Sequence, residues 1–122
     1  MPTLSEVMTK DLKTINHGAS VQTAAEHMRN HKIDSLIVEK AGNYVGVVTE
    51  ADVVSKAVAE RKDPTKTKVD EIMTSPIISI DAAQPLNKAH ALMALQNIRH
   101  LPVNQAGQIV GIVSARDLLL HF

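Results

Sequence analysis

The chain repeats itself, and this repeat limits the possible folds more than any other feature of the sequence. When the sequence is laid against itself with a shift of 65 residues, which places Gly46 on Gly111, related residues coincide along the whole length without a gap. The coinciding positions are mostly apolar and turn residues, and they include Met8 and Met73, Ala24 and Ala89, Leu36 and Leu101, and Gly42 and Gly107. This distribution is typical of a duplicated fold. We therefore predict two copies, residues 1–60 and 69–122, joined by a charged linker at 61–68.

Each copy is predicted to contain the same five elements in the order β-α-β-β-α. Ser20 can cap the first helix of the first copy, and Asp81 or Pro85 can begin the corresponding helix of the second copy. A turn containing Ala-Gly joins the second and third strands as a hairpin in each copy. The predicted strands are 12–15, 35–40 and 44–49, and then 77–80, 100–105 and 109–114; the last helices are 51–62 and 115–122.

One copy alone cannot bury both faces of its three-stranded sheet together with the apolar faces of its two helices. We therefore expect the two copies to pack sheet to sheet as one body with pseudo-two-fold symmetry. Such packing leaves two equivalent clefts between the copies. The predicted fold class is α+β with a tandem repeat.

Composition excludes several classes of function. Lysine plus arginine and aspartate plus glutamate number 13 each, so no net charge favours nucleic acid or an anionic membrane. The absence of cysteine excludes disulfides and thiolate metal sites. No apolar run approaches the ~20 residues of a membrane span, and the N-terminus does not resemble a signal peptide. The expectation is a soluble cytoplasmic protein without nucleic-acid or membrane partners.

A short phrase occurs at the same place in both copies: "GVVTEAD", Gly46 to Asp52, and "GIVSARD", Gly111 to Asp117. Each phrase can form a variant of the helix capping box, although an aspartate is short for reaching back to the N-cap, and capping does not require the glycine. Alternatively, the helix N-terminus can hold an anion while the aspartate binds ribose hydroxyls and the glycine admits a flat base. The occurrence of the phrase in both copies favours ligand binding.

The combination of motifs resembles a tandem pair of cystathionine-β-synthase (CBS) domains, also called a Bateman module. The resemblance is carried by "VMT" and "IMT" at the start of the copies, "LIV" and "LPV" on the middle strands, and the repeated phrase. It covers essentially the whole chain. It implies a sensor that binds AMP, ADP, ATP, S-adenosylmethionine or a related adenine compound in the clefts between the copies.

The resemblance also implies roles for individual residues. Asp52 and Asp117 would bind ribose, Thr49 and Ser114 would lie near ribose or phosphate, and Val47 and Ile112 would pack on adenine. The predicted preferred site consists of Ser79, Ile80, Arg99, His100, Pro102, Ile112, Ser114, Arg116 and Asp117, and the second site of Thr14, Ile15, Ser35, Val47, Thr49 and Asp52.

The two predicted sites differ where the phosphates are expected. The second copy has Arg99 and His100, which suit a polyanion, whereas the first copy has Asp34 and Ser35. An aspartate facing a phosphate would repel it. We therefore expect unequal sites, with the stronger one in the second copy.

The leading hypothesis is a non-catalytic regulatory module with no required cofactor or metal. Its ligand would be an adenine nucleotide or S-adenosylmethionine, and its output would be a homodimer rearrangement or a separate effector protein. The exposed positions among Val53, Val54, Leu118 and Leu119 could form a dimer surface, or the same residues could be core. The alternative is a protein-interaction scaffold without a small-molecule ligand; nucleic-acid binding is a third class that the net charge of zero disfavours.

Two further patterns have simpler structural explanations. His27 and His31 are four residues apart on a helix, but two histidines lack the three or four protein ligands that zinc takes. The segment around Ser114 lacks the glycines that flank a nucleophilic serine in G-x-S-x-G. A metal site and catalysis are therefore not predicted.

Overall fold

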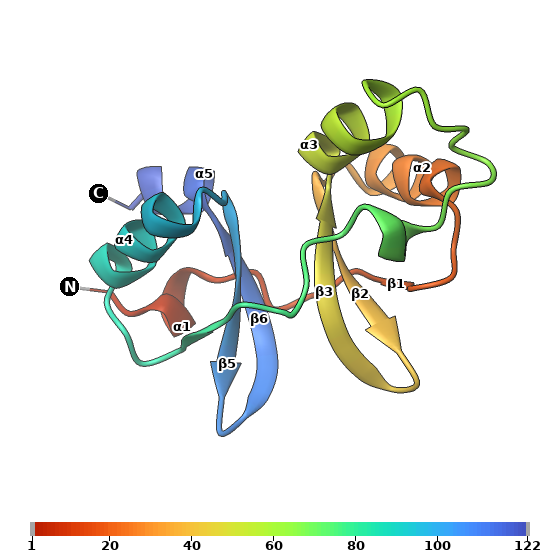
Figure 1. The fold of residues 1–122 in the computed structure, drawn as a ribbon. Coiled ribbons are helices and arrows are strands. Elements are labelled where there is room, and N and C mark those ends of the chain that lie inside the picture. The colour runs from red at the N-terminus through yellow and green to blue at the C-terminus, as the bar shows by residue number, and fades with distance from the viewer. Residues whose placement is uncertain (1, 122) are drawn as a thin grey trace. The chain divides into compact units, whose positions relative to one another are not determined.

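The computed structural model describes residues 2–121 and divides the chain into two compact units (Figure 1). The first-repeat unit is Lys13–Ile77, and the second-repeat unit combines Met1–Leu12 with Ile78–Phe122. These boundaries differ from those of the sequence repeat. Each unit contains the sheet of one copy and the opening segment of the other, which is residues 2–12 in the first copy and residues 69–77 in the second. No helix within residues 2–121 is both long and apolar enough to cross a membrane.

The first-repeat unit is a three-stranded sheet covered by helices. In the sheet, β2 lies between β1, to which it is parallel, and β3, to which it is antiparallel. The elements are β1 (Thr14–Asn16), α2 (Val21–His31), β2 (Ser35–Lys40), β3 (Asn43–Thr49), α3 (Glu50–Asp52), the π-helix η1 (Val53–Val58) and the 3-10 helix η2 (Val69–Glu71).

The second-repeat unit has the same sheet topology, with the order β4-β5-β6. Its helices α4 and α5 contact each other beside the β5–β6 hairpin (Figure 1). The elements are α1 (Leu4–Val7), β4 (Ile80–Asp81), α4 (Leu86–Gln96), β5 (His100–Gln105), β6 (Gln108–Ser114) and α5 (Ala115–Leu119). The predicted β-α-β-β-α order and the α+β class are therefore confirmed in both copies.

The first long helix of each copy begins differently. Ser20 caps α2 as predicted, because its Oγ accepts a hydrogen bond from the Thr23 N–H at 3.0 Å. The prediction that Asp81 can cap α4 is wrong: its carboxylate accepts from the Ala83 N–H at 2.8 Å in the turn before the helix. Pro85 occupies the N-cap of α4 instead, and it forms no side-chain cap.

The Ala-Gly turns set the register of the two hairpins. Ala41 and Gly42 have φ values of 50° and 82°, and Ala106 and Gly107 have 51° and 79°. Two consecutive residues with positive φ match the type I′ turn, whose twist suits a two-residue hairpin. The register then places Leu36 opposite Val48, and Leu101 and Val113 opposite each other.

Each unit has its own aliphatic core, which an opening segment completes. Leu4, in α1, is fully buried in the core of the second-repeat unit. Val69 and Ile72, in the opening segment of the second copy, are fully buried in the core of the first-repeat unit. The opening segments are therefore structural parts of the units, since their burial removes large apolar side chains from water.

Candidate functional site

The repeated phrase forms a complete capping box in the first copy. The Thr49 Oγ1 accepts from the Asp52 N–H at 3.1 Å, and the Asp52 Oδ2 accepts from the Thr49 N–H at 3.0 Å. The expectation that an aspartate reaches back poorly to the N-cap is therefore wrong in this copy. The hydroxyl and carboxylate of the phrase have a structural role at the start of α3.

The second copy forms the same capping box, but its aspartate lacks the ion pair that the aspartate of the first copy makes. The Ser114 Oγ accepts from the Asp117 N–H at 3.0 Å, and the Asp117 Oδ2 accepts from the Ser114 N–H at 2.9 Å. In the first copy, the remaining oxygen of Asp52, Oδ1, lies 3.0 Å from the Lys56 ammonium. Within residues 2–121, the Asp117 Oδ1 has no such partner. The sequence did not single out Lys56, although its i, i+4 spacing from Asp52 is a detectable signal.

The strand glycines are explained by protein contacts, which corrects the prediction that they admit a base or sugar. A Cβ atom at Gly46 would lie 2.6 Å from the Thr74 carbonyl oxygen and 2.9 Å from the Met73 Sδ. At Gly111, a Cβ atom would lie 2.5 Å from the Met8 Sδ. Glycine is therefore required at both places because an opening segment packs directly against the strand.

The side chains of the preferred site gather on one face of the β5–β6 hairpin. His100 lies opposite Ser114, and Pro102 lies opposite Ile112. The alternate residues on the two strands, such as Leu101, are buried in the core. Because side chains alternate across a sheet, these four candidate residues share the face opposite the core.

The remaining candidates of this site extend the same region. Ser79 precedes the core residue Ile80, so it lies on the non-core face, and its Oγ accepts from the Asn104 Nδ2 at 2.8 Å. The Arg99 carbonyl accepts from the N–H of Ala115, the first residue of α5, at 2.8 Å. The structure thus adds Asn104 to the neighbourhood that the sequence predicted.

The candidate residues also differ in how exposed their side chains are. Arg116 is exposed on α5, whereas Asp117, beside it, is half-buried. Ile15 and Ile80 are 6% and 8% exposed and belong to the two cores. Only the backbone of these two isoleucines is therefore available for a ligand.

The second predicted site has the corresponding arrangement in the first-repeat unit. Ser35 lies opposite Thr49, and residue 37 of β2 lies opposite Val47 and beside Thr14. The core residues Leu36, Val38 and Val48 alternate with them. Each predicted site therefore lies within one compact unit.

The two histidines of α2 are accounted for by local contacts. The His31 Nδ1 lies 3.0 Å from the His27 carbonyl oxygen, and the ring centroids are 5.6 Å apart. Among residues 2–121, no three histidine, cysteine, aspartate or glutamate side chains gather as a metal-ion site.

The family of the chain follows from its match to a known domain. The CBS-domain sequence profile matches residues 4–59 and again residues 69–122. The chain belongs to the CBS-domain family. The resemblance noted from the repeated motifs is thereby confirmed, and the chain contains a tandem CBS pair.

Known relatives of this CBS pair share most of its length. A protein of Methanopyrus kandleri, named as the uncharacterized protein MK0525, is 36% identical over 121 residues. The match covers 95% of this chain and 60% of that protein, so the relative contains additional sequence.

Solved CBS proteins have the same fold. A protein from Burkholderia ambifaria, proposed to act in signal transduction, has a TM-score of 0.93 at 28% identity, covering 98% of this chain and 92% of that one. A hexameric CBS-CP12 protein from bloom-forming cyanobacteria has a TM-score of 0.89 at 34% identity, covering 97% of this chain and 70% of that one.

Proposed function

We propose that this CBS pair is a non-catalytic regulatory module whose ligand is an adenine nucleotide or a related adenosyl compound. The binding surface would be the non-core face of the β5–β6 hairpin together with the start of α5. In this proposal Ile112 and Pro102 pack on adenine, Asp117 accepts hydrogen bonds from ribose, and Arg99 and His100 meet the phosphates. Family membership and the grouping of these side chains in one unit support it.

The observation that carries the proposal is the difference between the two aspartates. The Asp117 Oδ2 holds the capping box, which leaves Oδ1 to accept from a ribose hydroxyl without breaking a contact within residues 2–121. The Asp52 Oδ1 must first give up its 3.0 Å ion pair with Lys56. We therefore propose that the second-copy site binds more tightly than the first-copy site.

The experiment is a binding titration with AMP, ATP and S-adenosylmethionine, read by calorimetry and by thermal melting. A ligand present at a hundred times its Kd should stabilise the protein by about 2.7 kcal/mol. Asp117→Ala should abolish binding at the stronger site, while loss of the carboxylate from the capping box costs about 1 kcal/mol. Asp52→Ala is the matched control, and it should leave the stronger site unchanged.

The opposite results would support the scaffold alternative. If none of the three compounds changes the melting temperature or produces heat, the module is not an adenosyl sensor. If Asp117→Ala lowers stability but leaves affinity unchanged, the ribose role is wrong and the aspartate is only a cap.

The same proposal includes self-association through the final helices of the copies. Val53 and Leu118 pack against the two cores, whereas the neighbouring Val54 and Leu119 are 62% and 74% exposed. Val54 and Leu119 are equivalent in the repeat, so each unit presents an apolar side chain at the same place, which supports an interface. Leu119→Glu should reduce the mass measured by light scattering to that of a monomer; an unchanged mass would refute this interface.

A further inference from the structure

A hollow of about 700 Å³ lies in the first-repeat unit, away from the residues assigned to the adenosyl sites. Its rim includes His17 in the loop after β1, Lys40 and Tyr44 on either side of the β2–β3 turn, and Asp70 in η2. The rest of the lining is apolar apart from one serine, and consists of Val45, Met73, Ser75, Pro76 and Ile77. This volume lies within the range of small-molecule sites, which combine an apolar lining with a few polar groups.

The second-repeat unit provides an internal comparison, because one backbone contact beside the hollow is the same in both copies, although the cis Ser75–Pro76 bond of the lining is not repeated at residues 10 and 11. The His17 carbonyl accepts from the Asp70 N–H at 3.2 Å, and the equivalent Ala82 carbonyl accepts from the Ser5 N–H at 3.1 Å. The lining residue Met73 also has an equivalent methionine in the other copy. The duplicated fold therefore accounts for this backbone contact and for the methionine in the lining, but not for Ser75 and Pro76, whose equivalents in the other copy are Lys10 and Asp11.

The duplicated fold does not account for the rim. The four rim residues His17, Lys40, Tyr44 and Asp70 correspond in the second copy to Ala82, Gln105, Ile109 and Ser5. Every rim position thus carries an ionisable or aromatic side chain in the first copy and a side chain that is neither in the second. Because the fold forms without these groups in the other unit, their concentration around one hollow indicates a binding function.

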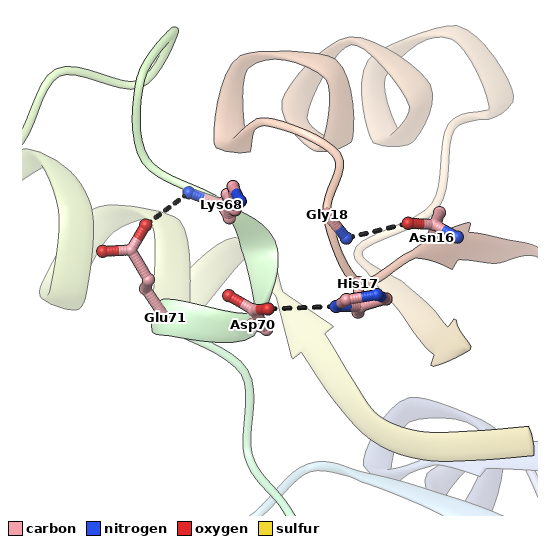
Figure 2. Close-up of polar contacts among 6 residues, drawn as sticks. All are labelled: Asn16, His17, Gly18, Lys68, Asp70 and Glu71. Carbon is pink, nitrogen blue, oxygen red and sulfur yellow. Dashed lines mark hydrogen bonds and ion pairs between the residues drawn. The ribbon is translucent and has the colours of Figure 1, made fainter. Parts of the chain in front are cut away.

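The charged and polar groups of the rim differ in whether they have a partner within the unit. The His17 Nδ1 lies 3.1 Å from the Asp70 Oδ2, and Figure 2 shows the two side chains facing each other from the loop and from η2. The Lys40 ammonium, by contrast, forms no ion pair with any residue of the described chain, 2–121. A ligand can therefore neutralise Lys40 without displacing an existing partner.

We propose that this hollow binds a small aromatic monocarboxylate. The aromatic body packs against the Tyr44 ring and the Met73 thioether, and the carboxylate pairs with the Lys40 ammonium. The Asp70 carboxylate, held by His17, disfavours a second negative charge on the ligand. The hollow therefore selects a monoanion over a phosphate ester. This inference does not depend on the adenosyl proposal, because the two sets of residues are separate.

The experiment uses indole-3-acetate as the probe and indole-3-acetamide as its neutral control. Each compound is titrated into the ¹⁵N-labelled full chain and followed by amide chemical shifts, to about 10 mM, because a ligand of this size is expected to bind with a Kd of about 1 mM. The acetate should shift amides around His17, Tyr44 and Asp70. It should bind about threefold more tightly than the acetamide, as one exposed ion pair allows.

Replacing Lys40 and Tyr44 with the residues found at the equivalent positions of the second copy tests their proposed roles in binding the carboxylate and the aromatic body. Lys40→Gln should reduce the affinity for the acetate to that for the acetamide, and Tyr44→Ile should weaken both compounds about fivefold. Gln105→Ala, at the position equivalent to Lys40, should change neither affinity. Asp117→Ala should also have no effect, which separates this site from the adenosyl site.

Four results would overturn the proposal. These are the absence of any shift at the highest concentration, equal affinity for acetate and acetamide, an affinity for the acetate that Lys40→Gln leaves unchanged, and shifts confined to residues away from the hollow.

Discussion

Replacing Gly46 with alanine tests the finding that an opening segment, and not a ligand, requires this glycine. The added Cβ would lie 2.6 Å from the Thr74 carbonyl oxygen, 2.9 Å from the Met73 Sδ and 3.3 Å from the Ser75 Cβ. The nearest atom belongs to the backbone, which has no alternative rotamer. Relief therefore requires the strand and the opening segment to separate.

The expected loss of stability can be estimated from two opposing effects. Val47 and Thr74 exchange backbone hydrogen bonds of 3.0 and 2.9 Å, and opening both costs about 2 kcal/mol at roughly 1 kcal/mol each. If the bridge stays closed, overpacking costs about 1–3 kcal/mol instead. Alanine in a strand regains about 0.5–1 kcal/mol relative to glycine. The net prediction is a loss of about 1–2 kcal/mol in the free energy of unfolding.

Urea unfolding followed by tyrosine fluorescence measures this loss in the relevant unit. The chain has one tyrosine and no tryptophan, and Tyr44 lies in the first-repeat unit. The matched variant is Gly111→Ala, followed by far-UV circular dichroism. There the nearest atom, at 2.5 Å, is the Sδ of the flexible Met8 side chain, and the backbone carbonyl oxygen of Thr9 is farther away, at 2.9 Å.

A second substitution distinguishes backbone from side-chain crowding. Met8→Ala should recover part of the loss caused by Gly111→Ala, because it removes the nearest atom. Met73→Ala should leave most of the loss caused by Gly46→Ala, because the Thr74 carbonyl remains. If Gly46→Ala costs less than about 0.5 kcal/mol, within the range of an ordinary surface change, the reasoning is refuted. Full recovery by Met73→Ala would refute the backbone explanation specifically.

Three further predictions concern local contacts. Thr49→Ala should lower the free energy of urea unfolding by about 1 kcal/mol, through loss of the α3 cap; an unchanged midpoint would contradict the capping box. Lys56→Ala should cost about 1–2 kcal/mol, because it removes both the partner of the Asp52 carboxylate, whose side chain is 11% exposed, and a 3.2 Å hydrogen bond from the Lys56 ammonium to the Ile72 carbonyl. Addition of 1 M NaCl should reduce the ion-pair part of that difference, because the Lys56 side chain is 47% exposed, and a cost below about 0.5 kcal/mol would contradict these contacts. The Thr65 hydroxyl and N–H lie 2.7 and 2.9 Å from the Asp63 Oδ1, and these hydrogen bonds lower the pKa of Asp63 below its ordinary value. The stability that the ionised Asp63 carboxylate contributes should therefore be lost as the pH falls through this lowered pKa. Thr65→Val should raise that pKa in an NMR titration, and an unchanged pKa would contradict the assignment.

Local sequence rules predicted the elements well because local interactions decide them. The spacing of apolar residues and the Ser20 cap located α2, and the Ala-Gly pairs located both hairpins. The strands β1 and β4 begin later than predicted, at Thr14 and Ile80. Their limits depend on parallel pairing with β2 and β5, which residues near them in sequence do not specify.

The candidate sites were predicted only in part. Strand alternation places Ser114 and Ile112 on one face from the sequence alone, and their pairing with His100 and Pro102 follows from the hairpin. The ion pair that occupies Asp52 depends on a lysine rotamer, which the sequence does not determine. The hollow likewise gathers side chains from three separate segments, and the repeat comparison becomes informative only once their proximity is known.

The amino-acid sequence by itself determined that the chain contains two equivalent folds, the order of their elements and the apolar face of each first long helix. It did not determine which copy of the "VMT" and "IMT" segments contacts which strand glycine, because each copy offers the same methionine and the same glycine. The tertiary structure decided this by placing Met73 against Gly46 and Met8 against Gly111. The physical reason is that each methionine could pack against either glycine by the same local contact. The choice therefore depends on the path of the segments that connect each methionine to the strands.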